Sequence, residues 1–202
     1  MTSLLYGPLS TRSLMVCIDM QRLFLEPGEW FAEPGVSILP QCKRLAQAGE
    51  ERCLFTRFIT ANNAAGARGT WQRYYRRWNS VTRDAIGEQA MDIHSILQPY
   101  ASPAQCFDKL THDAFNSVPF ARHIQAADPD ALVLFGIETD VCVLATALSA
   151  VDLGYRVIVV LDACASSAPE SHAACIEHIY PRFDQQIELT NTAKLLDAWN
   201  AI

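Results

Sequence analysis

The sequence predicts a three-layer α/β sandwich, in which helices cover both faces of a mostly parallel sheet of about six strands. Strand-like and helix-like segments alternate along the chain, as they do when each strand is followed by a crossover helix. The strand-like runs are apolar almost throughout, which is typical of parallel strands buried on both faces. The 202 residues are 50% hydrophobic and 19% charged, a composition that fits one compact domain over residues 1–202.

The predicted strands are short apolar runs bounded by turn residues. In chain order they cover residues 14–18, 52–58, 104–107, 131–135, 156–161 and 186–189. The run at 156–161 is the clearest buried strand of the chain. Because parallel strands end at the same edge of a sheet, residues that follow these runs are expected to lie near one another.

The helices are predicted from apolar residues that recur three and four positions apart. They are expected within residues 36–48, 85–97, 117–127, 141–151, 167–179 and 192–199. Gly49 and Gly154 are suited to end two of them, since glycine readily adopts the conformation that follows many helices. Ser167 and Glu170 have the spacing of a capping box at the start of another. Residues 20–24 are predicted to form a loop.

A long connection, residues 59–83, follows the second strand and combines basic with aromatic side chains. Its basic and aromatic members are Arg68, Trp71, Arg73, Tyr74, Tyr75, Arg76, Arg77, Trp78 and Arg83. Loops of this length in compact domains usually serve a function, so we predict a lid or a subunit contact. Stacking on RNA is the alternative. A net charge of −6 and a pI near 5.3 argue against a nucleic-acid or anionic-membrane surface.

Seven cysteines are present, and no two of them form a C-x-x-C pair. Four lie in or at the ends of strand-like runs, where a thiol packs as a small hydrophobic group. A disulfide framework or a zinc site is therefore not expected. The N-terminus has no long apolar stretch, and no run is long enough to span a bilayer, so we expect a cytoplasmic protein without membrane contact.

Three residues with reactive side chains follow three different predicted strands. They are Asp19, Lys109 and Cys142. In open parallel sheets ligands bind at the carboxyl edge, so this placement suggests a site. A buried structural cysteine and an ordinary ion pair are the alternatives. None of the five histidines follows a strand end with an apolar approach, so none is expected in the site.

The turn around Cys142 favours a reactive thiol. Gly136 permits a tight backbone at the end of the strand, Thr139 and Asp140 are good helix caps, and Cys142 falls in the first helical turn. There the helix dipole favours a thiolate. An ammonium about 4 Å from the sulfur would contribute roughly 4 kcal/mol at an effective dielectric of about 20, which is enough to offset ordinary desolvation.

Three stretches carry a likeness to a known family. They are Ile18–Gln21, Lys109 with Ala114–Phe115, and Gly136–Val143 followed by Thr146–Ala147. Together they resemble the signature regions of the isochorismatase-like cysteine hydrolases, and the likeness runs from about Leu14 to about Leu196. The third stretch is the specific one.

The resemblance implies a Rossmann-like sheet and a catalytic triad at Asp19, Lys109 and Cys142. It also implies a cis peptide bond between Ile137 and Glu138. The backbone N–H groups of Glu138 and Cys142 would then form an oxyanion hole. Members of the family commonly assemble as dimers or tetramers, so a homo-oligomer is implied as well.

Departures from the family pattern narrow the expected substrate. Nicotinamidases of this family carry an Asp-x-His metal site where this chain reads Arg57–Ala61, so no metal and no other cofactor is expected. Isochorismatases proper cleave a vinyl ether and can lack the cysteine. Cys142 therefore favours hydrolysis of a C–N bond in a small amide or ureido compound, through a thioester. A vinyl-ether hydrolase, a catalytically silent binding protein and a redox-sensing thiol protein are the alternatives.

The substrate pocket is predicted from residues beside the triad and from the 59–83 segment. Apolar walls, a polar contact through arginine and an aromatic lid are expected, and core packing is the alternative for the aromatic members. The Glu138 side chain is expected to meet either a polar substrate or a second subunit. The predicted pocket residues are Gln21, Phe24, Arg57, Trp71, Tyr75, Trp78 and Phe115.

Overall fold

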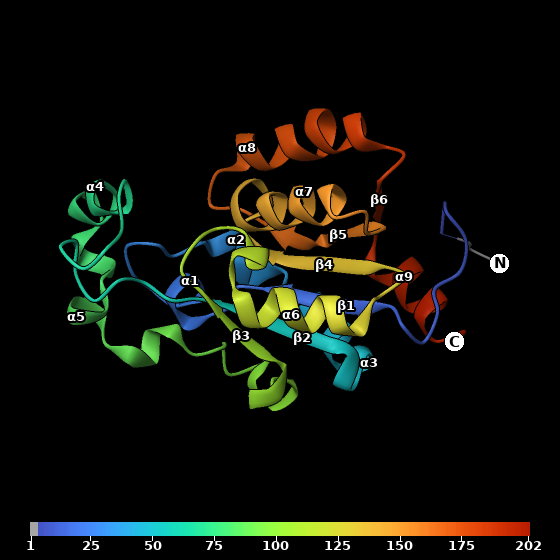
Figure 1. Ribbon diagram of the computed structural model, residues 1–202, viewed down its shortest axis with the longest axis horizontal. Coiled ribbons are helices and arrows are strands. Elements are labelled where there is room, and N and C mark those ends of the chain that lie inside the picture. The colour runs from blue at the N-terminus through green and yellow to red at the C-terminus, as the bar shows by residue number, and fades with distance from the viewer. Residues whose placement is uncertain (1–3) are drawn as a thin grey trace.

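The computed structural model describes residues 4–202, and within them six strands form one sheet in which every neighbouring pair is parallel (Figure 1). The strands are β1 (Leu14–Ile18), β2 (Cys53–Phe58), β3 (Cys106–Lys109), β4 (Leu132–Ile137), β5 (Val157–Ala165) and β6 (Ile187–Thr190). Their order across the sheet is β3-β2-β1-β4-β5-β6. The chain winds outward in both directions from β1 and β4, so the carboxyl ends of this central pair form the topological switch point.

The two central strands are buried along their whole length. Leu14 lies opposite Leu132 and Ile18 lies opposite Gly136, so the chain leaves both strands at the same level. Apolar side chains occupy both faces because helices cover the sheet on both sides. The seven cysteines are all free thiols.

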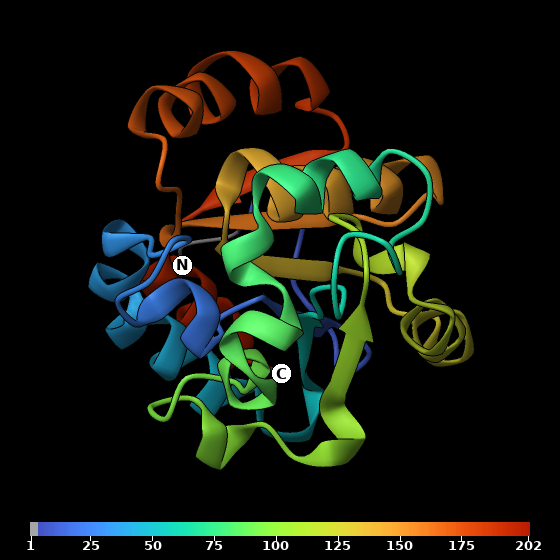
Figure 2. The same ribbon diagram turned by 90° about the vertical axis from the view of Figure 1, so that its left-hand side faces the viewer.

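Helices α3 and α9 pack together on one face of the sheet, and α6 and α7 cover the other face (Figure 2). In α3 the side chains of Cys42, Leu45 and Ala46 recur at helical spacing and are buried. The helices are α1 (Arg22–Leu25), α2 (Glu33–Ser37), α3 (Leu39–Gly49), α4 (Trp71–Arg77), α5 (Arg83–Ile86), α6 (Val118–Ala127), α7 (Leu144–Asp152), α8 (Pro169–Ala174) and α9 (Thr192–Trp199).

Two predicted helices are interrupted by residues that break the backbone pattern. The helix expected over 36–48 is divided into α2 and α3, because Pro40 has no N–H to donate to the carbonyl of Val36. The helix expected within 85–97 is replaced by the single turn of α5 and a 3₁₀ turn. Gly87, with a φ of 76°, separates the two.

Two further predictions on local structure were wrong. Residues 20–24 are not all loop, since α1 begins at Arg22. Ser167 does not cap α8, because Ala168 occupies the cap position and Pro169 starts the helix with a φ that already suits it. The third strand also begins two residues later than predicted and ends on Lys109.

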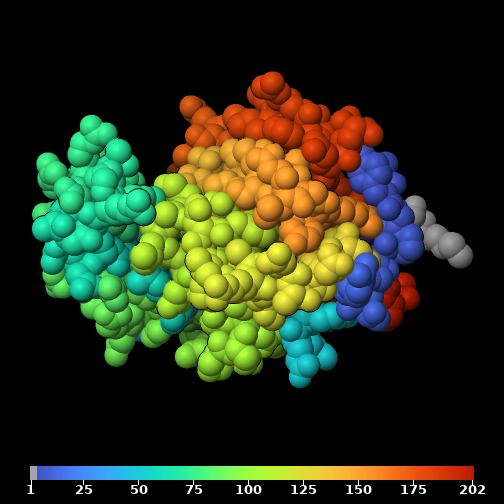
Figure 3. Space-filling view, in the orientation of Figure 1, coloured from blue at the N-terminus to red at the C-terminus, as the bar shows by residue number. Residues whose placement is uncertain are grey.

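The 59–83 segment contains α4 and projects, together with α5, beyond the carboxyl edge of the sheet (Figure 3). Tyr75 and Val81 of this segment pack with Leu23 and Met91 in a hydrophobic cluster of their own. Leu23 belongs to α1, which directly follows the end of β1, so the cluster fixes the segment beside the switch point. In the part of the chain that the structure describes, no helix has the length and apolarity needed to cross a membrane.

Candidate active site

Asp19 follows the last residue of β1 and turns the chain there with a φ of 51°. Aspartate is one of the few residues other than glycine that adopt this left-handed conformation at small cost. The Thr56 hydroxyl donates to Asp19 Oδ1 at 2.7 Å, and the Asp19 N–H donates to the Thr56 carbonyl at 3.2 Å. The neighbouring strand β2 therefore fixes both the backbone and the carboxylate of Asp19.

Lys109, the last residue of β3, extends its side chain toward the switch point. Its Nζ lies 2.6 Å from Asp19 Oδ2 and donates to the Thr111 carbonyl at 3.0 Å and to Cys142 Sγ at 3.4 Å. The ammonium thus has two hydrogen-bond acceptors and one ion-pair partner. Burial opposes the charge of this lysine, but Asp19 and the Cys142 sulfur outweigh burial and raise the pKa of Lys109.

Cys142 lies in the turn that joins β4 to α7. Gly136 has a φ of 120° and lies against the backbone of Ile18, where a Cβ would not fit. The peptide bond between Ile137 and Glu138 is cis. Residues Thr139–Val143 form a single π-helical turn in which the N–H groups of Val141 and Val143 both donate to the Glu138 carbonyl at 3.1 Å.

The expected capping of this turn by Thr139 or Asp140 was wrong. Glu138 holds the cap position, and no side chain caps the turn. The Thr139 hydroxyl instead forms a 2.8 Å hydrogen bond with Nδ1 of His172, on α8. A contact between segments 33 residues apart outweighs the local preference of threonine for a cap.

Cys142 is buried, with 6% of the residue exposed. Burial raises the pKa of Cys142 well above its usual range, the Asp19 carboxylate raises it further, and Lys109 lowers it by less than these two effects together. The expectation that Lys109 offsets desolvation of a thiolate was therefore wrong for the ligand-free protein. The resting charges are a carboxylate, an ammonium and a neutral thiol, which sum to zero.

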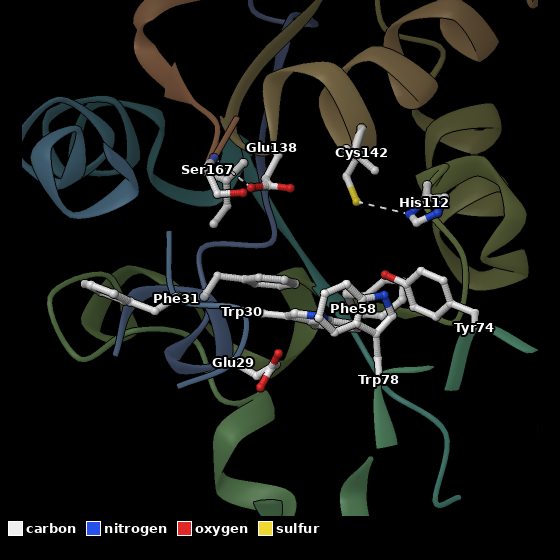
Figure 4. Close-up of a pocket in the computed structure, with 13 residues that line it drawn as sticks. Glu29, Trp30, Phe31, Phe58, Tyr74, Trp78, His112, Glu138, Cys142 and Ser167 are labelled. Atoms are coloured by element: carbon white, nitrogen blue, oxygen red, sulfur yellow. Dashed lines mark hydrogen bonds between the residues drawn. The ribbon is translucent and has the colours of Figure 1, made fainter. Parts of the chain in front are cut away.

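A cavity of about 270 Å³ opens beside Cys142 (Figure 4). This is close to the lower end of the range for small-molecule sites, about 300–1,000 Å³. Its lining residues are Phe24, Glu29, Trp30, Phe31, Phe58, Tyr74, Trp78, His112, Ile137, Glu138, Val141, Cys142 and Ser167. In Figure 4, Glu138, Cys142 and His112 lie along one side, and an aromatic row lies opposite them.

The predicted pocket residues are divided between this cavity and other places. Phe24 and Trp78 line it, as does Glu138, whose Oε1 accepts the Ser167 N–H at 2.8 Å. Trp71 and Tyr75 line a second cavity of about 690 Å³, which Lys109 lines as well.

Three of the predicted pocket residues have structural contacts instead. Gln21 is fully buried and holds the end of β2, through a 2.6 Å bond from the Phe58 N–H and a 3.1 Å bond to its carbonyl. Arg57 forms a two-pronged ion pair with Asp108 at 2.7 and 2.9 Å. Phe115 packs edge-on against Phe120, 5.3 Å between ring centroids, and does not line the cavity.

His112 was not expected in the site, yet it faces the sulfur. Its Nδ1 lies 3.9 Å from Cys142 Sγ, and its ring stacks on Phe58 with 6.1 Å between centroids. Burial and the nearby Lys109 charge lower the pKa of His112, so it is neutral at pH 7. His112 stands only three residues after Lys109, the last residue of β3. Because the strand was predicted to end at Phe107, the closeness of His112 to the strand end was not recognised.

The other cavity residues that were not predicted for the pocket are Glu29, Trp30, Phe31, Phe58, Tyr74, Ile137, Val141 and Ser167. Tyr74 stands four residues before Trp78, so the two share one side of α4, and this spacing could have identified it. Trp30 and Phe31 lie in the loop between α1 and α2, where no periodicity marks them. Among residues 4–202, no group of three or more histidine, cysteine or acidic side chains is arranged to hold a metal ion.

Comparisons with known proteins agree with this architecture. Residues 13–191 match the family of the isochorismatase domain. The uncharacterized isochorismatase family protein YecD of Escherichia coli O157:H7 is 36% identical over 69 residues, 34% of this chain and only 37% of that protein. A probable inactive nicotinamidase of Arabidopsis thaliana is 27% identical over 171 residues, 80% of this chain and 85% of that protein.

A solved structure supports the fold independently. The crystal structure of a cysteine hydrolase from Pseudomonas syringae pv. phaseolicola 1448A has a TM-score of 0.80 and 22% identity, over 98% of this chain and 97% of that chain. The family match covers all six strands and the turn that carries Cys142. On this evidence the chain belongs to the isochorismatase family.

Proposed function

We propose that the protein is a cysteine hydrolase that cleaves a C–N bond in a small amide or ureido compound. The observation that carries the proposal is the convergence of Asp19 and Lys109 on Cys142, whose sulfur lies beside a cavity. A nucleophile, a base and a cation in mutual contact are the parts that covalent acyl transfer requires. Family membership supports a hydrolase, and a relative with a nicotinamidase name supports an amide substrate.

In the first half of the proposed reaction, the Asp19 carboxylate takes the thiol proton while Cys142 Sγ attacks the carbonyl carbon. A C–S bond forms, and the carbonyl oxygen becomes an oxyanion that the Glu138 and Cys142 N–H groups stabilise. When the oxyanion collapses, the C–N bond breaks and the leaving nitrogen takes the proton from Asp19. Ammonia or an amine leaves, and the acyl group remains on sulfur as a thioester.

In the second half, water attacks the thioester carbonyl and gives a proton to Asp19. The C–S bond breaks, the carboxylic acid leaves, and the proton on Asp19 returns to the Cys142 sulfur. Lys109 keeps its proton throughout and stabilises whichever partner is negative. The buried trio therefore keeps a net charge of zero whether the proton is on sulfur or on Asp19, so no uncompensated charge is left in the protein interior.

The proposal is tested by ammonia release from a panel of small amides and ureido acids. The wild-type protein should turn over at least one of them, and Cys142→Ala should lose that turnover. Cys106→Ala is the control, because Cys106 is a free, partly buried thiol at the start of β3 that lies outside the cavity. Full activity in Cys142→Ala would refute the proposed role of this cysteine.

A catalytically silent binding protein is the second candidate, since one relative is named as inactive. It would bind amides without releasing ammonia and would show no acyl adduct. A vinyl-ether hydrolase would release a pyruvyl or enol product without ammonia, and Cys142 would be dispensable. We also propose that the protein is a homo-oligomer in the cytoplasm. Sedimentation of the purified protein tests its oligomeric state, and fractionation of the cells that produce it tests its location.

A further inference from the structure

We propose that the cavity beside Cys142 selects amides that carry a positively charged group, such as an alkylammonium. The inference deepens the proposed function and rests on it, because it assigns the part of the substrate that is not cleaved. Two features of the cavity carry it, a surface of aromatic rings and a pair of carboxylates.

The aromatic surface is built around Trp30. Its ring is stacked on Phe24 at 6.0 Å, and the rings of Tyr74 and Trp78 lie 5.8 and 6.2 Å away, tilted or edge-on. These contacts come from two segments more than 40 positions apart in sequence and hold the rings at fixed angles. Figure 4 shows the row of rings across the cavity from Glu138 and Cys142. Aromatic faces of this kind attract cations, most strongly when the cation leaves water.

The charges on the lining have one sign. Glu29 and Glu138 are the charged residues that line the cavity, and no lysine or arginine of residues 4–202 does so. One oxygen of Glu138 accepts the Ser167 N–H, and the second has no hydrogen-bond partner among the described residues. His112 is neutral, since burial lowers its pKa. An anionic substrate would therefore meet two carboxylates and no cation on the lining.

Two basic side chains contact residues of the lining without belonging to it. Lys109 contacts Cys142, but its charge is paired with Asp19 at 2.6 Å. Arg77 lies over the Trp78 ring at 5.0 Å and is not part of the cavity lining. Glu138 would contact both the reacting end and the charged end of the substrate. Its backbone N–H is proposed to face the reacting oxygen, while its free carboxylate oxygen would meet the cation.

The experiment uses three primary amides of equal chain length that end in an ammonium, a methyl or a carboxylate group. For the wild-type enzyme we expect kcat/KM for the ammonium amide to exceed that for the methyl amide by about ten-fold or more. The carboxylate amide should be the poorest of the three. The preference for the cation should shrink as salt is added, since ions screen the attraction.

Variants assign the preference to the proposed groups. Glu138→Gln keeps an oxygen for the Ser167 N–H but removes the charge, and Trp78→Leu removes one ring. Each should lower the ratio of kcat/KM between the ammonium and methyl amides several-fold. Glu51→Gln removes an exposed carboxylate before β2, at the opposite edge of the sheet, and should leave the ratio unchanged.

Calorimetric binding of the same amides to the Cys142→Ala protein separates the two proposals. Tighter binding of the ammonium amide, without turnover by the wild-type enzyme, would support the cation site and refute the hydrolase. Turnover in which the methyl or carboxylate amide is preferred would support the hydrolase and overturn the cation site. Absence of both binding and turnover would overturn both.

Discussion

The Lys109 ammonium lies 2.6 Å from the Asp19 carboxylate, and the two side chains are 0% and 1% exposed. A buried pair of this kind depends on both partners, because either charge alone would lack both solvent and a counter-charge. The same ammonium contacts Cys142 at 3.4 Å, so the pair is a structural feature and part of the proposed catalytic apparatus. Its removal should therefore affect both stability and activity.

Lys109→Met should destabilise the fold by about 3–5 kcal/mol, since it leaves the Asp19 carboxylate buried without its partner. Urea unfolding followed by circular dichroism measures this change. Lys194→Met, on the exposed side of α9, is the control and should change the unfolding free energy by less than about 0.5 kcal/mol. Adding Asp19→Asn to Lys109→Met should restore part of the lost stability. If the double variant is as unstable as the sum of the two single variants, the pair is not coupled.

Asp19→Asn should destabilise the fold by about 3–5 kcal/mol, since it leaves the Lys109 ammonium buried without its counter-charge. It should also lower kcat by about 10²–10⁴-fold, because the amide cannot take the thiol proton. Alkylation of Cys142 by iodoacetamide should quicken in the same variant, because the Asp19 carboxylate raises the pKa of this thiol and its removal leaves the Lys109 charge, which lowers that pKa. Peptide mass spectrometry gives the alkylation rate for each cysteine. Asp184→Asn, an exposed aspartate outside the cavity, is the control. An unchanged alkylation rate would show that Asp19 does not set the pKa of Cys142, and an unchanged kcat would exclude Asp19 as the base.

Gly136→Ala should be among the most damaging substitutions in the chain. A Cβ at this position would collide with the Ile18 backbone, in addition to facing a φ of 120°. Gly154→Ala is the matched comparison, because Gly154 has a φ of 86° but no atom within 4 Å of the added methyl group. Thermal unfolding should show a loss of about 1 kcal/mol for Gly154→Ala. The loss for Gly136→Ala should be several times larger, and equal losses would contradict the close approach of β4 to β1.

The free energy of unfolding should depend on pH in the range where His112 gains a proton. An unfolded histidine titrates near about 6.5, and the folded pKa of His112 is lower because burial and Lys109 oppose its charge. Stability from this residue is therefore complete above about pH 6.5 and is lost as the pH falls through the lower, folded value. His112→Asn should reduce the difference in unfolding free energy between pH 7.5 and pH 5.5, measured with urea.

His94 shares the direction of this shift, because burial lowers its pKa too. His94→Asn should remove a separate part of the same pH dependence, and the two effects should add if the sites do not interact. A His112→Asn protein whose unfolding free energy changes with pH as steeply as that of the wild type would contradict the buried, neutral state of this histidine.

Much of the fold followed from local patterns in the sequence. The first strand was predicted with its true bounds, and α9 likewise, because continuous apolar runs and amphipathic spacing report burial directly. The divided helix at Pro40 and the extension of β5 to Ala165 did not follow. The division of the helix depends on the single N–H that Pro40 lacks, and the extension of β5 depends on pairing with a strand that is distant in sequence. Sheet order and register are relationships between segments, so no single window of sequence contains them.

The candidate site divides in the same way. Asp19, Lys109 and Cys142 could be predicted because each stands at a strand end, and parallel strands bring those ends to one edge. Trp30 could not be, since its place depends on how a loop and the 59–83 segment pack on each other. His112 was missed because β3 ends at Lys109 and not at Phe107. Gln21 and Arg57, in contrast, were predicted to line the pocket and do not. Both are polar and near the edge, but the first hydrogen-bonds to β2 and the second pairs with Asp108.

The central claim is that Cys142 carries the acyl group during turnover, and one measurement tests it most directly. Intact-protein mass spectrometry is performed on the enzyme quenched in acid while it hydrolyses a slow amide substrate. We predict an adduct with the mass of the acyl group, located on the peptide that contains Cys142 and removed by hydroxylamine as a thioester is. Steady turnover with Cys142 unmodified, or an adduct on a different residue, would contradict the account.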